Sequence, residues 1–192
     1  MNKKIIIGVI VVIIIAIIGV LFFLGSSNLI IPAGESQITL PSQYTIDDKG
    51  IAYNGDIGIY FTSVVGSSPK DQIKFFNTIK SNGKDAGYKN VTTKKIKGYK
   101  TYQYSANPKE LKEVSSDRQA SGNYETWKEY KPYTPFTDIT DMDVVSFRCI
   151  EYVNKDSKDI CDLYIFTNNT DVDLYSPDMQ KIVNSIAPNE AG

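Results

Sequence analysis

The sequence contains no histidine. Ser-His-Asp and Cys-His catalysis, metal sites built on imidazole and histidine pH switches are therefore excluded. Only two cysteines occur and they form no Cys-x-x-Cys motif, so a thiol–disulfide oxidoreductase is not expected. The acidic clusters lack the EF-hand spacing, and no pair of carboxylates is marked out as acid and base. We expect no enzymatic activity, no bound metal and no cofactor.

A surplus of positive charge is also absent, because 21 basic residues stand against 22 acidic ones. Lys3 and Lys4 lie at the N-terminus, which leaves 19 basic residues against the same 22 acidic ones in the rest of the chain. The resulting charge near −3 argues against a nucleic-acid-binding groove. We expect no nucleic-acid partner.

One long apolar run is present, from Ile5 to Leu24, and it contains no charged residue. About 20 apolar residues in a helix cross the ~30 Å hydrocarbon core of a bilayer. Lys3 and Lys4 before the run favour a cytoplasmic N-terminus. The pattern predicts a transmembrane anchor over residues 1–24 of a single-pass cell-membrane protein, with its C-terminal domain outside the cell. A cleaved signal peptide is the alternative, since Leu24-Gly25-Ser26 would tolerate cleavage.

The rest of the chain divides into three parts. Residues 25–36 contain Gly, Ser and Pro without periodicity and are expected to form a tether. Residues 37–187 are expected to form a single globular domain, and residues 188–192 a C-terminal tail. The segment 107–143 is long for a connection, so we expect it to be an inserted loop or to carry short elements.

Strands and two helices are expected within the domain. Tyrosines and β-branched residues favour sheet, and Asn54-Gly55 is a strong signal for a hairpin. Ser followed by Pro at the start of residues 69–82 and of residues 177–186 predicts two helices. The expected fold is therefore α+β, with an antiparallel β-sheet covered by two helices and preceded by one transmembrane helix.

Cys149 and Cys161 fall in the last two predicted strands. A register that sets them directly opposite each other also sets Phe147 opposite Leu163 on the same face, and brings the two Cβ atoms to about 4.5–5.5 Å. Outside the cytoplasm such a pair would oxidise. We predict a disulfide between Cys149 and Cys161; two buried free thiols are the alternative.

Three sets of side chains are candidates for contact with other molecules. A set of four aromatic residues forms either a platform for a partner or the seal of the core edge. A set of four lysines either contacts an anionic surface or protects an exposed edge hairpin. The two asparagines begin glycosylation sequons. The sets are Trp127, Tyr130, Tyr133 and Phe136; Lys94, Lys95, Lys97 and Lys100; and Asn90 and Asn168.

Three short stretches resemble the PsbP/DcrB-like family. They are Ile38-Thr39-Leu40-Pro41-Ser42-Gln43-Tyr44, Ile96-Lys97-Gly98-Tyr99 and Met179-Gln180-Lys181-Ile182-Val183-Asn184-Ser185-Ile186. The resemblance covers about residues 37–187 and brings no catalytic residues with it. It implies an extracytoplasmic binding or assembly factor.

These observations predict a membrane-anchored extracytoplasmic binding or assembly domain without catalytic activity. Its partners would be the membrane, through the run from Ile5 to Leu24, and a protein or envelope component of unknown identity. A pilin-like structural subunit is one alternative, because pilins also join an apolar N-terminal helix to a β-rich head. A carboxylate-based hydrolase is another, since such acid–base pairs need no histidine.

Overall fold

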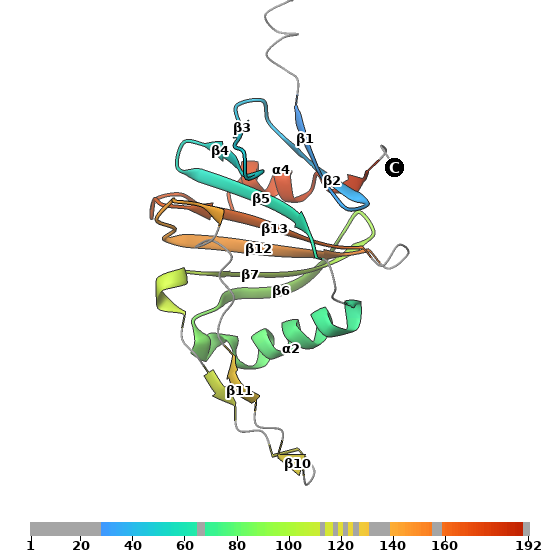
Figure 1. Ribbon diagram of the computed structural model, residues 1–192, viewed down its shortest axis with the longest axis vertical. Coiled ribbons are helices and arrows are strands. Elements are labelled where there is room, and N and C mark those ends of the chain that lie inside the picture. The colour runs from blue at the N-terminus through green and yellow to red at the C-terminus, as the bar shows by residue number, and fades with distance from the viewer. Residues whose placement is uncertain are drawn as a thin grey trace, which may run out of the picture.

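The computed structural model of the protein describes residues 28–64, 68–111, 114–116, 119–120, 123–124, 127–130, 139–154 and 159–189. Its centre is a seven-stranded antiparallel sheet in the order β3-β4-β5-β13-β12-β7-β6 (Figure 1). The strands are β3 (Thr45–Ile46), β4 (Ala52–Asn54), β5 (Ile57–Ser63), β6 (Lys89–Ile96), β7 (Tyr99–Ala106), β12 (Ser146–Val153) and β13 (Ile160–Thr167).

A second antiparallel sheet and a short helix cover one face of the main sheet (Figure 1). The second sheet has the order β1-β2-β14, formed by Leu29–Ala33, Ser36–Leu40 and Ala187–Pro188. Its alternating side chains, Ile31, Ala33, Ile38 and Leu40, are buried against the main sheet together with helix α4 (Pro177–Val183). The predicted tether was therefore wrong from residue 29 onward, because these apolar residues complete the core.

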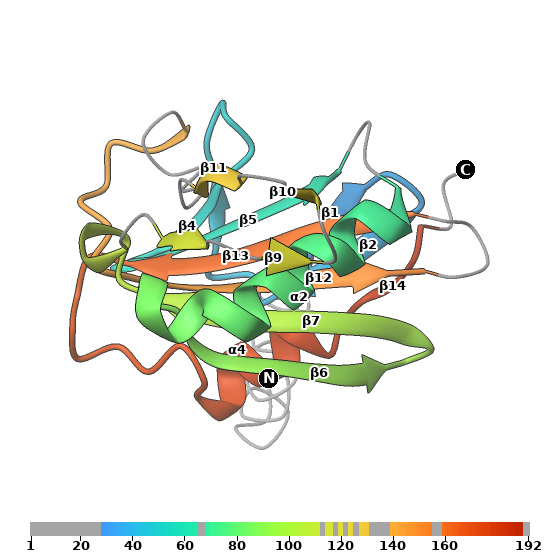
Figure 2. The same ribbon diagram turned by 90° about the horizontal axis from the view of Figure 1, so that it is seen from below.

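Helix α2 (Pro69–Ala86) crosses the other face (Figure 2). Phe76 and Ile79 on its inner side are buried against aromatic residues of the sheet. The helix begins at the predicted Pro69 but continues past Gly83 to Ala86. It ends at Gly87, whose φ of 96° is a conformation that favours glycine.

The predicted fold class was wrong. The described chain is mostly β, with ten strands in its two larger antiparallel sheets, four more in two short two-stranded sheets, and only two α-helices, α2 and α4. One face of the sheet is covered largely by a second sheet, not by a helix alone. The difference arises because residues assigned to the tether and to the tail pair with β2 as β1 and β14.

Within the described part of the chain, no helix is long and apolar enough to span a membrane. The run from Ile5 to Leu24 lies outside the described residues. The predicted single-pass anchor, with the cytoplasmic N-terminus and extracytoplasmic domain that followed from it, therefore has no support in the described residues. We set the anchor and the location aside.

The segment 107–143 carries short elements. A 3₁₀ turn, η1 (Pro108–Glu110), is followed by β8 (Val114–Ser116), β9 (Gln119–Ala120), β10 (Asn123–Tyr124) and β11 (Trp127–Tyr130). β11 pairs with β8 and β10 pairs with β9, so the chain folds back on itself on the α2 side of the molecule (Figure 1).

The predicted disulfide was also wrong. In the pairing of β12 with β13, Cys149 lies opposite Tyr164 and Cys161 opposite Tyr152. This register differs by three residues from the expected one, and an odd shift moves the two cysteines to opposite faces of the sheet. Cys149 is buried beneath α2 and Cys161 beneath the second sheet, and both thiols are free.

We therefore expect dithiothreitol to leave the melting temperature of the full-length protein unchanged. Burial raises the pKa of both thiols, so little reactive thiolate is present at neutral pH. Intact-mass measurement after alkylation should show two modified cysteines in denaturant and none in the native protein. If the cysteines still resist alkylation after the protein is unfolded in the absence of reductant, they are bonded to each other, and this register is wrong.

Candidate functional site

The charged residues are segregated along the chain. Residues 69–100 contain nine lysines and two aspartates, a net charge of +7, whereas the whole chain carries −1. All other residues together therefore carry −8. The lysines are Lys70, Lys74, Lys80, Lys84, Lys89, Lys94, Lys95, Lys97 and Lys100, and we call the surface that they form the lysine-rich surface.

Four of these lysines lie on α2. Lys70, Lys74, Lys80 and Lys84 are all exposed, and their spacing places them on the outer side of the helix. The inner side is occupied by the buried Phe76 and Ile79. An 18-residue helix is about 27 Å long, and Lys70 to Lys84 extend along most of it.

The other five lysines lie on the hairpin of β6 and β7, beside α2 (Figure 2). β6 is the last strand of the main sheet, and Lys89, Lys94 and Lys95 on it are exposed. Lys97 and Gly98 both have positive φ, of 46° and 89°, as a type I′ turn requires. The structure thus places the four predicted residues Lys94, Lys95, Lys97 and Lys100 in one hairpin.

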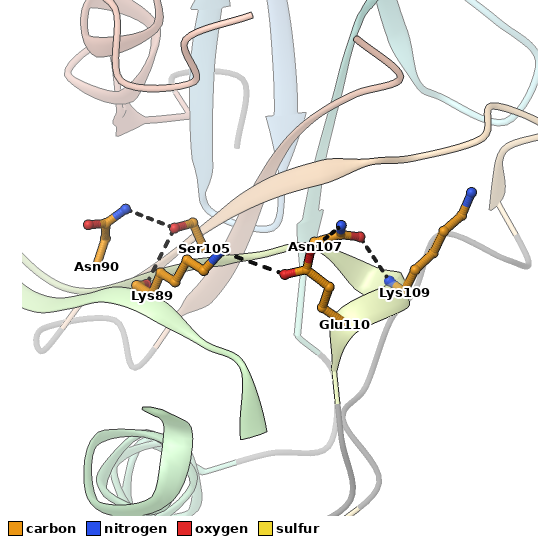
Figure 3. A network of polar contacts seen from close by, with 6 residues as sticks. All are labelled: Lys89, Asn90, Ser105, Asn107, Lys109 and Glu110. Carbon is orange, nitrogen blue, oxygen red and sulfur yellow. Dashed lines mark hydrogen bonds and ion pairs between the residues drawn. The ribbon is translucent and has the colours of Figure 1, made fainter. Parts of the chain in front are cut away.

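A polar network fixes the start of β6 (Figure 3). The Asn90 side-chain amide donates to Ser105 Oγ at 3.0 Å, and Ser105 Oγ donates to the Lys89 carbonyl at 3.3 Å. Lys89 Nζ lies 3.6 Å from Glu110 Oε2, and Asn107 donates to the same carboxylate at 3.1 Å. These contacts hold β6 next to the 3₁₀ turn, at the point where its register against β7 shifts. The side-chain amide of the sequon residue Asn90 is thus already hydrogen-bonded.

The remaining predicted residues do not join this surface. Trp127 and Tyr130 lie in the short strand β11, where only the backbone is described, and Tyr133 and Phe136 lie outside the described residues. Asn168 follows β13 in an exposed bend. The sequence interpretation missed the lysines of α2, although their helical spacing is visible in the sequence.

A second group of ionisable side chains is buried under α2. Glu151 on β12 and Asp162 on β13 lie directly opposite each other, and Glu151 is 5 % exposed. Glu151 Oε1 and Asp162 Oδ1 have no hydrogen-bond partner among the described residues, while Tyr164 donates to Asp162 Oδ2 at 3.2 Å. Burial raises the pKa of Glu151 to about 8, with a further contribution from Asp162, and burial raises that of Asp162 to about 7. The pair therefore retains at least one proton near neutral pH.

The described residues contain no group of three or more His, Cys, Asp or Glu side chains placed to hold a metal ion. Comparisons with family models, curated proteins and solved structures found no match for the chain. The resemblance to the PsbP/DcrB-like family therefore stays a prediction.

Proposed function

We propose that the protein is a non-catalytic binding or assembly domain whose lysine-rich surface binds an acidic segment of a protein partner. The single observation that supports this proposal is the segregation of charge, with +7 on residues 69–100 and −8 on the rest of the chain. Like charges repel one another, so their concentration on α2 and the neighbouring hairpin is unfavourable for the isolated protein and favourable for an anionic partner.

Protection of the sheet edge explains only part of this surface. Exposed edge strands commonly carry lysines that prevent pairing with other chains, and Lys94 and Lys95 on β6 fit that role. Lys70, Lys74 and Lys80 lie on a helix, whose backbone groups are already hydrogen-bonded and need no such protection. The α2 lysines therefore favour a role in binding.

An acidic protein segment suits the surface better than a nucleic acid does. A long polyanion would extend beyond the lysine-rich surface and meet the negative charge of the remaining molecule. Binding of single strands also uses exposed aromatic side chains as stacking platforms. The exposed large hydrophobic residues of the described chain, Ile30, Ile46 and Tyr175, all lie outside α2, β6 and β7.

We expect the double variant Lys80→Glu/Lys84→Glu to bind a synthetic glutamate-rich peptide about tenfold more weakly than the wild type, because two attractive charges become repulsive. The affinity of the wild type should fall steeply with added salt. Fluorescence anisotropy with a labelled peptide and the full-length protein measures both effects. Both lysines are exposed, so the melting temperature should stay close to that of the wild type.

The matched control is Lys49→Glu/Lys181→Glu, which makes the same change of charge at exposed positions outside the lysine-rich surface. This control should lower the affinity only slightly. Equal losses in both double variants would show that net charge alone governs binding and would overturn the proposal. Tighter binding of duplex DNA than of the peptide, at equal salt, would overturn the choice of a protein partner.

A further inference from the structure

Arg148 on β12 is a buried cation that forms no ion pair with a carboxylate of the described residues, although the exposed Asp173 lies near enough to oppose the lowering of its pKa by burial. Its side chain points to the α4 side of the main sheet, opposite the lysine-rich surface, and the residue is 1 % exposed. The ion pairs of the described residues join other side chains, all of them largely exposed. A buried guanidinium without a counter-charge is unfavourable unless its donors are satisfied.

The hydrogen bonds of Arg148 leave one of its three nitrogens without any partner among the described residues. Nη1 donates to the Leu174 carbonyl at 3.2 Å, and Nη2 donates to Gln103 Oε1 at 2.8 Å and to Gln180 Oε1 at 3.2 Å. Nε is buried and has no partner among the described residues. The bond to Gln180 is the longer of the two at Nη2, and both acceptors there are neutral amides.

Two surface side chains cover this part of the guanidinium. The ring of Tyr175 lies over it, with its centroid 4.3 Å from Cζ, and Tyr175 is 39 % exposed. Gln180 on α4 is partly exposed, and its amide nitrogen donates to Asn184 Oδ1 at 3.0 Å on the surface of the helix. A rotation of Gln180 therefore frees a donor position at Nη2 without moving a strand of the main sheet.

We propose that Arg148 is the anchor of a binding site for a carboxylate group. One carboxylate oxygen accepts the hydrogen of Nε, and the other replaces Gln180 as an acceptor at Nη2. These two donors lie side by side on one edge of a guanidinium and match the two oxygens of a carboxylate. Tyr175 then covers the ion pair. This site is separate from Lys80 and Lys84, the residues changed in the charge-reversal variant, because α2 and α4 lie on opposite faces of the sheet.

The side-chain Nε–H signals of arginine in a ¹H–¹⁵N spectrum test this proposal directly. The sequence contains only two arginines, Arg118 and Arg148, so the full-length protein gives two such signals and one serves as an internal reference. On addition of sodium acetate, the Arg148 signal should move and saturate, whereas sodium chloride at equal ionic strength should leave it in place. Arg148→Lys assigns the signal and should abolish saturable binding of acetate, measured as an acetate-dependent rise in melting temperature.

A variant of Gln180 adds a second test. Gln180→Ala removes the competing acceptor and should tighten acetate binding about fivefold. Lys181→Ala, at the neighbouring exposed position, should leave acetate binding unchanged. A short peptide with a free C-terminus that saturates at lower concentration than acetate, while its C-terminal amide does not bind, would assign the carboxylate to a protein terminus. Saturation by acetate alone would assign it to a small acid.

Three results would overturn the proposal. The Arg148 signal would fail to move in acetate beyond its response to chloride, or both arginine signals would move together without saturation. Alternatively, inorganic phosphate would saturate the Arg148 signal at lower concentration than acetate, which would assign the site to another anion. Failure of this test leaves the charge-reversal result at the lysine-rich surface unaffected.

Discussion

Gly58→Ala is expected to destabilise the full-length protein by about 3 kcal/mol or more. Gly58 lies in β5 opposite Phe166 of β13, and both residues are buried. A Cβ at this position would lie far inside van der Waals contact with Cε2 and Cζ of the Phe166 ring. The backbone of Gly58 has an ordinary negative φ, so the cost comes from the ring and not from backbone strain. Urea unfolding of the two proteins measures the difference.

A substitution of Phe166 provides the control. In the background of Phe166→Leu, which removes the atoms that clash, the further change Gly58→Ala should cost less than about 1 kcal/mol. A double-mutant cycle thus isolates the contact between the two side chains. A loss for Gly58→Ala that is the same in both backgrounds would mean that the ring does not lie over Gly58.

Local signals in the sequence predicted several elements correctly. Asn54-Gly55 predicted a hairpin, and β4 and β5 form it, although Asn54 pairs with Ile57 and the turn residues are Gly55, with a φ of 57°, and Asp56. The two Ser-Pro pairs predicted the helix starts at Pro69 and Pro177, and Ser176 Oγ accepts from the Met179 amide at 3.4 Å. These signals succeed because turn and cap residues act on neighbouring backbone groups, independently of the rest of the fold.

The register of β12 and β13 could not be predicted in the same way. Both strands are buried along nearly their whole length, because α2 covers one face and the second sheet the other. Without an alternation of polar and apolar residues, several registers pair apolar side chains equally well. The expected register placed Cys149 and Cys161 together, whereas the actual register places them on opposite faces. The same ambiguity concealed the pairing of Glu151 with Asp162.

The candidate sites differ in how far the sequence reveals them. The hairpin lysines were predicted because they cluster around Gly98, whereas the α2 lysines were missed although their helical spacing is visible in the sequence. With Cys149 opposite Cys161, as in the expected register, Arg148 would lie opposite Asp162 on the other face of the hairpin. In the structure, Arg148 lies opposite Ile165 and Asp162 opposite Glu151, so they are on different faces and both face covering elements. Whether a charged residue in the middle of a strand is buried can be decided only when the elements that cover the two faces of the sheet are known.

The buried pair Glu151 and Asp162 should make the protein less stable as the pH rises. In the unfolded chain these carboxyls titrate near their ordinary values of 4.5 and 3.8, whereas in the folded protein their pKa values are raised to about 8 and about 7. The folded state therefore binds more protons than the unfolded state between these values. The stability linked to the pair is fully present below about pH 4 and is lost as the pH rises through 7 to 8.

We expect the free energy of unfolding to fall by about 6 kcal/mol between about pH 5 and about pH 8, since one pKa unit corresponds to about 1.4 kcal/mol and the raised pKa values of both carboxyls contribute over this range. Chemical unfolding of the full-length protein over this range measures the slope. The neighbouring Cys149, Tyr104 and Tyr164 all have raised pKa values and stay uncharged in the folded protein over this range. The slope therefore reports on the two carboxyls.

Glu151→Gln replaces the protonated acid by a neutral side chain of the same shape and should flatten the slope. It also removes the repulsion that an ionised Glu151 would exert on Asp162, so the variant should be more stable than the wild type at about pH 8 and similar to it at about pH 5. Asp141→Asn, which removes an exposed carboxylate, is the matched control and should retain the slope of the wild type. A wild-type protein whose stability rises from about pH 5 to about pH 8, or a Glu151→Gln variant with an unchanged slope, would show that the pair is ionised in the folded state, and the register that buries it beneath α2 would then be wrong.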